Sequence, residues 1–381
     1  MSRNFKQIHF LGTVQQPLLE ILKPSGQKHV LPFIKENRRR DSNEQWWSAK
    51  TGFTGNSKWN FRIILNGIPV FPQLPRKYHA TDLEELWFQD GELFNYQPPS
   101  LISPSKVCKK REFRGILSTR PLYIYTPRGY IENKNHSYPV IYMHDGQNCF
   151  ESFVKDSFAG SWRAEEAADF SIGQGLMKEC IIVGVSHGKE ERLWEYLPPY
   201  AHYPQEKKEA EKPGNPPVLP QQGRADRTLK YYRDCVAPYI GENYRVLKNR
   251  NDTATCGSSM GGLFSSYIAW EFPQFAGQHA IVSPSYWITS NESGALEGIE
   301  IILSSKKRRE VRLWLDSGTR YGADYGDDGM HDTKKVRDAF LKLGYRQGKD
   351  FQYHLAEGAL HQESAWAARL PSIFQFLFPL N

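Results

Sequence analysis

Short, uninterrupted apolar runs alternate with helical patterns over most of the chain after residue 105. Continuous apolar runs are typical of strands that are buried on both faces of a parallel sheet. Helices then have to cover both faces, so the pattern predicts an α/β domain with a mostly parallel central sheet over residues 106–381. We expect its strands at Leu122–Tyr125, Val140–Met143, Ile181–Val185, Thr253–Cys256, Ala280–Val282, Val311–Leu315 and Phe351–His354.

Residues 1–105 have a different pattern. Strand-like fragments at 46–53 and 59–65 are followed by the turn pair Asn66-Gly67 and a proline-rich stretch. This arrangement predicts a small β-sandwich. The segment YQPPSLISP at 96–104 has the proline content of a linker, so we place the domain boundary at residue 105.

Composition fits a globular protein of two domains. The chain has 381 residues, of which 39% are hydrophobic and 24% charged, which excludes global disorder. The first residues, MSRNFKQIHFLGT, lack the apolar core of a secretory signal, and no run approaches a membrane span. We therefore expect a cytoplasmic protein that does not bind a membrane. The five cysteines are scattered and form no CxxC pair, so we also expect no metal site.

The net charge of +7 includes basic clusters at 38–40, 109–111 and 306–309. These clusters are short and dispersed and belong to no recognisable nucleic-acid module, so we interpret them as solvated surface and expect no nucleic-acid partner. A polar, proline-rich insertion at 203–222 lacks apolar periodicity. It is either a plain surface loop or a lid over the site.

The segment Gly257-Ser258-Ser259-Met260-Gly261 follows a predicted strand and precedes a helical run. This is the GxSxG nucleophile elbow in its strand-turn-helix context. Small residues are needed there because the serine sits on a sharp turn where larger neighbours would collide with strand and helix. Ser259 is therefore the candidate nucleophile.

A serine hydroxyl needs a positioned base, and a histidine suits that role at neutral pH. Among the eleven histidines, His361 follows the last predicted strand and a short loop, where the carboxyl edge of the sheet would bring it beside the elbow. We expect His361 to be the base, and a core or surface histidine is the alternative.

The third member should be a carboxylate that orients the histidine and follows the strand at 311–315. Asp324, Asp327 and Asp328 all lie in the loop YGADYGDDGM. Counting back from a helix expected to start near Thr333 favours Asp327, with Asp328 next. The others would then cap the helix or face solvent.

An oxyanion hole needs two backbone N–H groups aimed at the developing negative charge. One should belong to Met260, directly after the nucleophile. The other should come from the loop HDGQN at 144–148, where we expect the amide of Gln147. No organic cofactor or metal is required by this set.

Five blocks of this chain resemble, in the same order, the putative esterase family, which includes enterochelin esterases, feruloyl and acetyl xylan esterases and S-formylglutathione hydrolase. The resemblance covers about residues 110–381 and implies an α/β-hydrolase fold and a serine esterase activity. Ser259 and His361 fall on motif positions, whereas Gly318-Thr319 is followed by Arg320 instead of the family's acid. The blocks are YPVIYMHDGQN at 138–148, RLWEYLPP at 192–199, GSSMGGL at 257–263, SPSYW at 283–287 and EGALHQESAWAARLP at 357–371.

The resemblance also implies roles outside the triad. Tyr196 and Trp287 lie in blocks that line the pocket of relatives, so they are expected substrate contacts. Residues 1–105 resemble the immunoglobulin-like sandwich that precedes the catalytic domain of enterochelin esterases. Its tryptophans either stack on a ligand or form the sandwich core; they are Trp46, Trp47, Trp59 and Trp87.

Together these features predict a serine esterase whose partner is a small-molecule ester, with an enterochelin-like siderophore ester first and a feruloyl or acetyl carbohydrate ester second. A non-catalytic carbohydrate- or partner-binding protein on a hydrolase scaffold, and acyl transfer to an acceptor other than water, are the alternatives from other classes. The sequence gives no indication of the oligomeric state.

Overall fold

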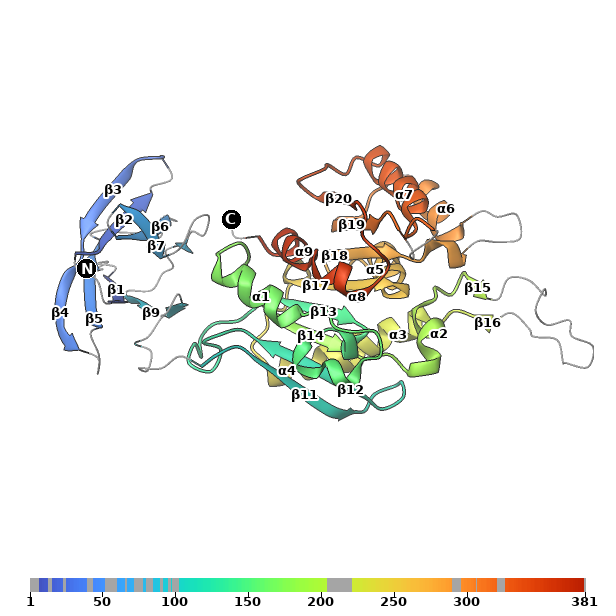
Figure 1. Ribbon diagram of the computed structural model, residues 1–381, viewed down its shortest axis with the longest axis horizontal. Coiled ribbons are helices and arrows are strands. Elements are labelled where there is room, and N and C mark those ends of the chain that lie inside the picture. The colour runs from blue at the N-terminus through green and yellow to red at the C-terminus, as the bar shows by residue number, and fades with distance from the viewer. Residues whose placement is uncertain are drawn as a thin grey trace, which may run out of the picture.

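The computed structural model shows an α/β body and, before it, two smaller sheets (Figure 1). It describes residues 7–12, 16–22, 25–39, 44–51, 60–65, 67–71, 78–79, 85–89, 92–94, 97, 103–203, 221–289, 296–305, 307–320 and 326–379.

The α/β body contains an eight-stranded sheet with the order β11-β12-β14-β13-β17-β18-β19-β20. The β11–β12 and β12–β14 pairs are antiparallel and the remaining pairs are parallel. All seven predicted strands are confirmed; the one that was missed, β11, carries mostly charged residues instead of an apolar run. The strands are β11 (Lys106–Phe113), β12 (Arg120–Thr126), β13 (Val140–His144), β14 (Ile181–Val185), β17 (Thr253–Ser259), β18 (Gln278–Pro284), β19 (Arg312–Gly318) and β20 (Phe351–Ala356).

Helices cover both faces of this sheet (Figure 1). Two apolar clusters, one on each face, bury the strands, as continuous apolar runs require. One face packs against α1 (Ala164–Gly173), α8 (Glu363–Ala367) and α9 (Leu370–Leu377). The other packs against α2 (Arg192–Tyr196), α3 (Ala225–Tyr231), α4 (Ala237–Asn243), α5 (Met260–Glu271), α6 (Glu297–Leu303) and α7 (Met330–Lys342).

Several short elements connect these layers. The 3₁₀ turns η1 (Gly146–Asn148), η2 (Glu151–Asp156), η3 (Lys189–Glu191), η6 (Arg250–Asp252) and η7 (Tyr286–Thr289), and the π-helical turn η5 (Tyr232–Val236), lie between the main strands and helices. The insertion predicted as a loop or lid is flanked by the paired strands β15 (His202–Tyr203) and β16 (Gln221–Gln222). Its residues 204–220 lie outside the described part of the chain.

The N-terminal region holds two five-stranded sheets around one apolar core. Sheet order is β10-β9-β1-β5-β4 in the first and β3-β2-β6-β7 in the second, where β8 also pairs with β6. Ile8 and Phe88 of the first sheet share a buried cluster with Ile21 and Phe61 of the second. The strands are β1 (Gln7–Gly12), β2 (Leu18–Leu22), β3 (Lys28–Pro32), β4 (Ile34–Arg39), β5 (Gln45–Lys50), β6 (Asn60–Leu65), β7 (Ile68–Phe71), β8 (Tyr78–His79), β9 (Glu85–Gln89) and β10 (Glu92–Phe94).

The tryptophans of this region contribute to its packing. Trp46 is 5% exposed and Trp87 4% exposed, and their rings meet edge to face. Trp47 packs against the core between the sheets, and Trp59 lies outside the described residues. The buried pair is therefore core and offers no stacking surface to a ligand.

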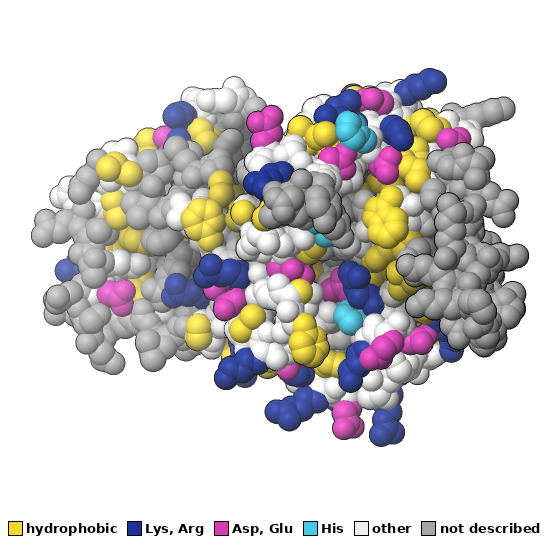
Figure 2. All heavy atoms as spheres, turned by 45° about the vertical axis from the view of Figure 1, so that its right-hand side comes forward, with side chains coloured by type: hydrophobic (Ala, Val, Ile, Leu, Met, Phe, Trp, Pro, Cys, Tyr) yellow, Lys and Arg dark blue, Asp and Glu magenta, His cyan; other side chains and the backbone are white. Residues whose placement is uncertain are grey.

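The charged side chains and the cysteines are distributed through the fold. Lys and Arg side chains are interspersed with Asp and Glu over the face drawn in Figure 2, instead of forming one basic patch. All five cysteines are free thiols, and Cys149, Cys180 and Cys256 are buried. No helix in the described part of the chain combines the length and the apolar character needed to cross a membrane.

Candidate active site

Strand β17 runs directly into helix α5 through a strained turn at Ser259. The backbone of this residue has φ 56° and ψ −121°, a conformation that non-glycine residues rarely adopt and that recurs at functional sites. A Cβ at Gly257 would lie 2.5 Å from the His144 ring and 2.9 Å from the backbone of Gly261. The predicted strand-turn-helix context of the elbow is confirmed, and the glycine is required by close packing.

The loops that follow β18, β19 and β20 reach the same edge of the sheet as Ser259. Parallel strands present their carboxyl ends together, which is where α/β proteins place their sites. The Ser259 hydroxyl is hydrogen-bonded to the hydroxyl of Ser285 at 3.1 Å. The Ser285 N–H also donates to the Ser259 carbonyl at 3.1 Å, so the segment after β18 packs directly on the elbow.

The carboxylate that meets His361 is Asp328. Its Oδ1 is hydrogen-bonded to His361 Nδ1, and its side chain is fully buried. The second oxygen, Oδ2, accepts the hydroxyl of Ser283 at 2.6 Å and the backbone N–H of Gly318. Because a carboxylate only accepts, Nδ1 of the neutral imidazole carries the proton and Nε2 is left as the basic nitrogen.

Asp327, which the sequence favoured, has a different position. Its carboxylate accepts the N–H groups of Gly329 at 3.0 Å and His331 at 3.3 Å, so it caps helix α7. Helix α7 begins at Met330 instead of Thr333, and Asp328 has the rare backbone angle φ 54°. The acid is therefore identified by its contacts and not by its spacing from the helix. Asp324 lies outside the described residues.

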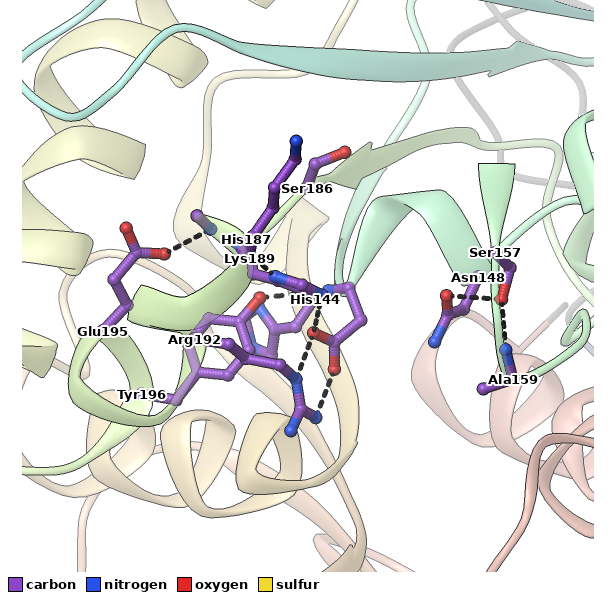
Figure 3. Close-up of polar contacts among 12 residues, drawn as sticks. His144, Asn148, Ser157, Ala159, Ser186, His187, Lys189, Arg192, Glu195 and Tyr196 are labelled. Carbon is purple, nitrogen blue, oxygen red and sulfur yellow. Dashed lines mark hydrogen bonds and ion pairs between the residues drawn. The ribbon is translucent and has the colours of Figure 1, made fainter. Parts of the chain in front are cut away.

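Gln147 lies in η1, directly after β13, on a loop held by Asp145. The Asp145 backbone is left-handed, with φ 55° and ψ 50°. Its two carboxylate oxygens each accept a 2.7 Å bond from Arg192, through Nε and Nη2 (Figure 3). Its N–H donates to the Tyr196 hydroxyl at 3.1 Å. Bidentate pairs of this kind fix geometry as well as charge, so the loop that carries Gln147 is rigidly placed.

Helix α2, which supplies Arg192 and Tyr196, is itself anchored by a buried ion pair. Glu195 receives bonds of 2.7 and 2.8 Å from the guanidinium of Arg120 on β12. It also accepts the Gly188 N–H at 2.9 Å, and Figure 3 shows Glu195 on the same helix as Arg192. The Arg192 and Asp145 roles were missed from sequence, although both residues lie in the blocks RLWEYLPP and HDGQN.

The two expected substrate contacts differ in exposure. Tyr196 is 1% exposed and stacks on Phe264 with an interplanar angle of 13°, so it presents no surface to a ligand and instead holds the Asp145 loop. Trp287 is 52% exposed and lies in η7, two residues after the Ser285 that contacts Ser259. Of this pair, Trp287 is therefore the exposed residue and Tyr196 the buried one.

Glu363 connects the histidine loop to the Gln147 loop. It lies two residues after His361, and its Oε1 accepts the side-chain amide of Asn148 at 3.3 Å. The side-chain oxygen of Asn148, Oδ1, accepts the Ser157 hydroxyl at 2.8 Å (Figure 3). Partial burial raises the pKa of Glu363. The loops after β13 and β20 are therefore joined directly at the site.

His144 lies beneath the elbow as a neutral, buried group. Its ring nitrogens are hydrogen-bonded to the Tyr232 hydroxyl at 2.9 Å and the Ser265 hydroxyl at 3.0 Å. Burial lowers the pKa of His144 to about 3, and burial lowers the pKa of His279 on β18 to about 3 as well. Both imidazoles are structural at neutral pH.

Because His144 and His279 are buried as neutral groups, we expect the stability of the fold to decrease in acid. An unfolded histidine has a pKa of about 6.5, so between pH 6.5 and 3 the unfolded chain binds more protons and stability falls as the pH falls. At pH 5 the loss is about 2 kcal/mol for each histidine relative to pH 7 or above. Urea unfolding of the parent and of His279→Gln at pH 5 and pH 7 measures this loss of stability. The variant should lose about half of this pH dependence, and an equal dependence in both proteins would contradict the assignment.

The described residues contain no group of three or more His, Cys, Asp and Glu side chains placed to hold a metal ion. The arrangement instead brings together a strained serine, a histidine with its Nδ1 paired to a buried carboxylate, and two segments, the start of α5 and η1, that carry the candidate oxyanion amides. This is the set of groups that acyl transfer through a serine needs.

The model of the putative esterase family matches residues 116–377. The chain belongs to the putative esterase family. The match spans most of the α/β body and contains Ser259, Asp328 and His361. The protein is a carboxylic ester hydrolase with an α/β esterase fold.

One related protein and two solved structures are similar to this chain. The uncharacterized protein YbbA of Bacillus subtilis (strain 168) is 23% identical over 264 residues, which cover 69% of this chain and 94% of YbbA. A ferulic acid esterase superposes with a TM-score of 0.52 at 18% identity, covering 72% of this chain and 98% of its own. An IroE-like serine hydrolase from Shewanella oneidensis has a TM-score of 0.53 at 21% identity, covering 72% and 80%.

Proposed function

We propose that Ser259, His361 and Asp328 form a catalytic triad that hydrolyses a carboxylic ester through an acyl-enzyme. The observation that carries this proposal is the bond from His361 to the buried Asp328 carboxylate, at the same sheet edge as a serine on a strained elbow. The bond fixes the tautomer in which Nε2 can take the serine proton.

In the proposed reaction, Ser259 Oγ attacks the ester carbonyl while His361 Nε2 accepts its proton. The oxyanion is stabilised by the amides of Met260, the first residue of α5, and Gln147. His361 then gives the proton to the leaving alcohol, and the acyl-enzyme forms. Water, deprotonated by the same Nε2, attacks the acyl group and releases the acid and the free serine.

For the substrate, we propose an ester that carries an aromatic group, with an enterochelin-like siderophore ester first and a feruloyl sugar second. The half-exposed Trp287 supports both, since an open indole face can stack on a catechol or a feruloyl ring. The similarity in fold to a ferulic acid esterase supports the feruloyl sugar as the second candidate substrate. The free, largely buried cysteines fit a reducing compartment, and we propose the cytoplasm.

For the N-terminal region, we propose that residues 1–105 form an immunoglobulin-like β-sandwich domain. The two five-stranded sheets and the cluster of side chains that they share support this assignment.

The nucleophile can be tested without knowing the substrate. A fluorophosphonate should label the parent protein once, and peptide mapping should place the adduct on Ser259. Ser259→Ala should remove the label, while the matched variant Ser285→Ala, which changes the hydroxyl 3.1 Å away, should keep it. An adduct on Ser285, or equal labelling of Ser259→Ala, would contradict the proposed mechanism.

Turnover of a panel then ranks the substrate classes. Aryl esters, feruloyl and acetyl sugars and a catecholate trilactone should be hydrolysed only by the parent and Ser285→Ala, with the catecholate and feruloyl esters preferred over acetyl esters. Added alcohols or sugars would reveal acyl transfer by a new ester product. Binding of panel members without any serine-dependent turnover would favour a non-catalytic role.

A further inference from the structure

A polar network lies buried directly beneath Asp328, outside the triad. Its centre is Ser283 at the end of β18, a residue 1% exposed with the rare backbone angle φ 39°. The Ser283 hydroxyl has three partners. They are Asp328 Oδ2 at 2.6 Å, Arg369 Nη2 at 3.0 Å and Trp366 Nε1 at 3.1 Å.

The direction of each of these bonds follows from counting protons. An indole N–H and a guanidinium N–H can only donate, and a serine hydroxyl has one hydrogen and two lone pairs. Trp366 and Arg369 therefore occupy both lone pairs of Ser283. Its single hydrogen has only one acceptor left, Asp328 Oδ2, so the hydroxyl is fixed as a donor to that carboxylate.

We propose that Ser283, Trp366 and Arg369 are positioning residues. They hold the Asp328 carboxylate in the orientation that accepts the hydrogen bond from His361 Nδ1–H. The proposal rests on the proposed triad. The Gly318 N–H supports the same oxygen from β19. Oδ2 thus receives two donors, and Oδ1 is left for the histidine. Trp366 acts at both ends, because its ring also meets the His361 ring edge to face at 5.0 Å.

Asp316 balances the charge that Arg369 brings into this buried site. The carboxylate is fully buried at the end of β19 and accepts Arg369 Nη2 at 3.1 Å. It also accepts Trp314 Nε1 at 2.7 Å and the Ser283 N–H at 3.2 Å. Burial raises the pKa of Asp316, and Arg369 opposes that rise. The Arg369 guanidinium is therefore linked to Asp328 through two hydrogen bonds by way of Ser283, and its pairing with Asp316 leaves no net charge in this buried site.

The charged and titratable groups that surround the network come from six segments. Asp328 lies before α7, His361 and Glu363 lie at α8, Arg369 precedes α9, Asp316 lies on β19, and His354 and Cys256 approach Asp316 from β20 and β17. Ser283 donates directly to Asp328 and can be changed without altering any charge, which makes it the sharpest position to test.

The first test compares the parent with Ser283→Ala and Ser283→Gly. Both variants remove the hydroxyl, and the glycine also relieves the positive φ, so agreement between them excludes backbone strain as the cause. Loss of one hydrogen bond to a charged group should lower kcat by about 10- to 100-fold. KM should stay unchanged because no substrate contact is removed. An unchanged kcat in both variants would overturn the proposal.

A second readout separates positioning from a structural effect. Asp328 with one donor fewer is a less stabilised anion and stabilises the imidazolium of His361 more strongly, so the acid limb of the kcat/KM profile should move to higher pH. Histidine-labelled NMR titration without substrate should move in the same direction. Parent-like profiles in both Ser283→Ala and Ser283→Gly would refute the assignment.

The Arg369 contribution is tested by charge-matched variants. Arg369→Lys keeps the cation and a donor, whereas Arg369→Met combined with Asp316→Asn removes the ion pair without leaving a buried charge. The lysine variant should retain most of the kcat and the double variant should resemble Ser283→Ala. Equal kcat in the double variant and the parent would exclude Arg369. If the parent lacked serine-dependent turnover, the proposed function would fail, whereas the NMR titration would still decide the positioning role.

Discussion

Asp328→Asn is expected to lower kcat by about 10⁴-fold, as loss of the triad acid does in serine hydrolases. An asparagine fills the same volume, but its amide turns a hydrogen-bond donor toward His361 or leaves Nδ1 with a weaker acceptor. The imidazole then loses the tautomer in which Nε2 is basic, and no carboxylate stabilises the imidazolium. Steady-state kinetics on the best ester of the panel measures this loss.

Asp327→Asn is the matched control for that experiment. The same chemical change one residue earlier alters a side chain that caps α7, so kcat should stay within about threefold. Stability should change little, because the asparagine oxygen still accepts these N–H groups. The two variants together separate the triad from the helix cap. A larger fall of kcat in Asp327→Asn than in Asp328→Asn would reverse the assignment.

The sheet could be predicted from the sequence because burial on both faces leaves a local signal in each strand. The seven continuous apolar runs correspond to β12, β13, β14, β17, β18, β19 and β20. Strand β11 lacks this signal, since it lies at the edge of the sheet and exposes Lys109, Lys110 and Arg111 in part. An edge strand is identified by its partner, and the pairing with β12 becomes visible only in the folded chain.

In the site, too, residues that are set by their sequence neighbours could be predicted, and residues that depend on distant segments could not. The elbow is predictable because the close approach of its backbone requires glycines within the motif itself. The acid is less predictable, because the position of Asp328 depends on a left-handed backbone and on Ser283 and Gly318 from two other strands. Tyr196 and Arg192 gain their roles through Asp145, 51 and 47 residues away in sequence.

Gly146→Ala is expected to lower kcat/KM by about 10²- to 10³-fold, which is the cost of losing one oxyanion donor. A Cβ at this position would lie 2.5 Å from the Gly184 carbonyl oxygen and 2.6 Å from the Val185 nitrogen. Strand β14 lies inside the sheet and cannot retreat, so η1 must move outward. The Gln147 amide moves with it, although Arg192 still holds Asp145.

Gly241→Ala provides the control for the Gly146 variant. Gly241 lies within α4, and an added Cβ meets no atom within 4 Å, so alanine should stabilise the helix by about 0.5 to 1 kcal/mol and leave kcat/KM unchanged. Thermal unfolding of both variants distinguishes a displaced loop from an unfolded protein. A folded Gly146→Ala enzyme with parental kcat/KM would show that the η1 loop does not supply the oxyanion amide, and the hole would then have to be built from the α5 side alone.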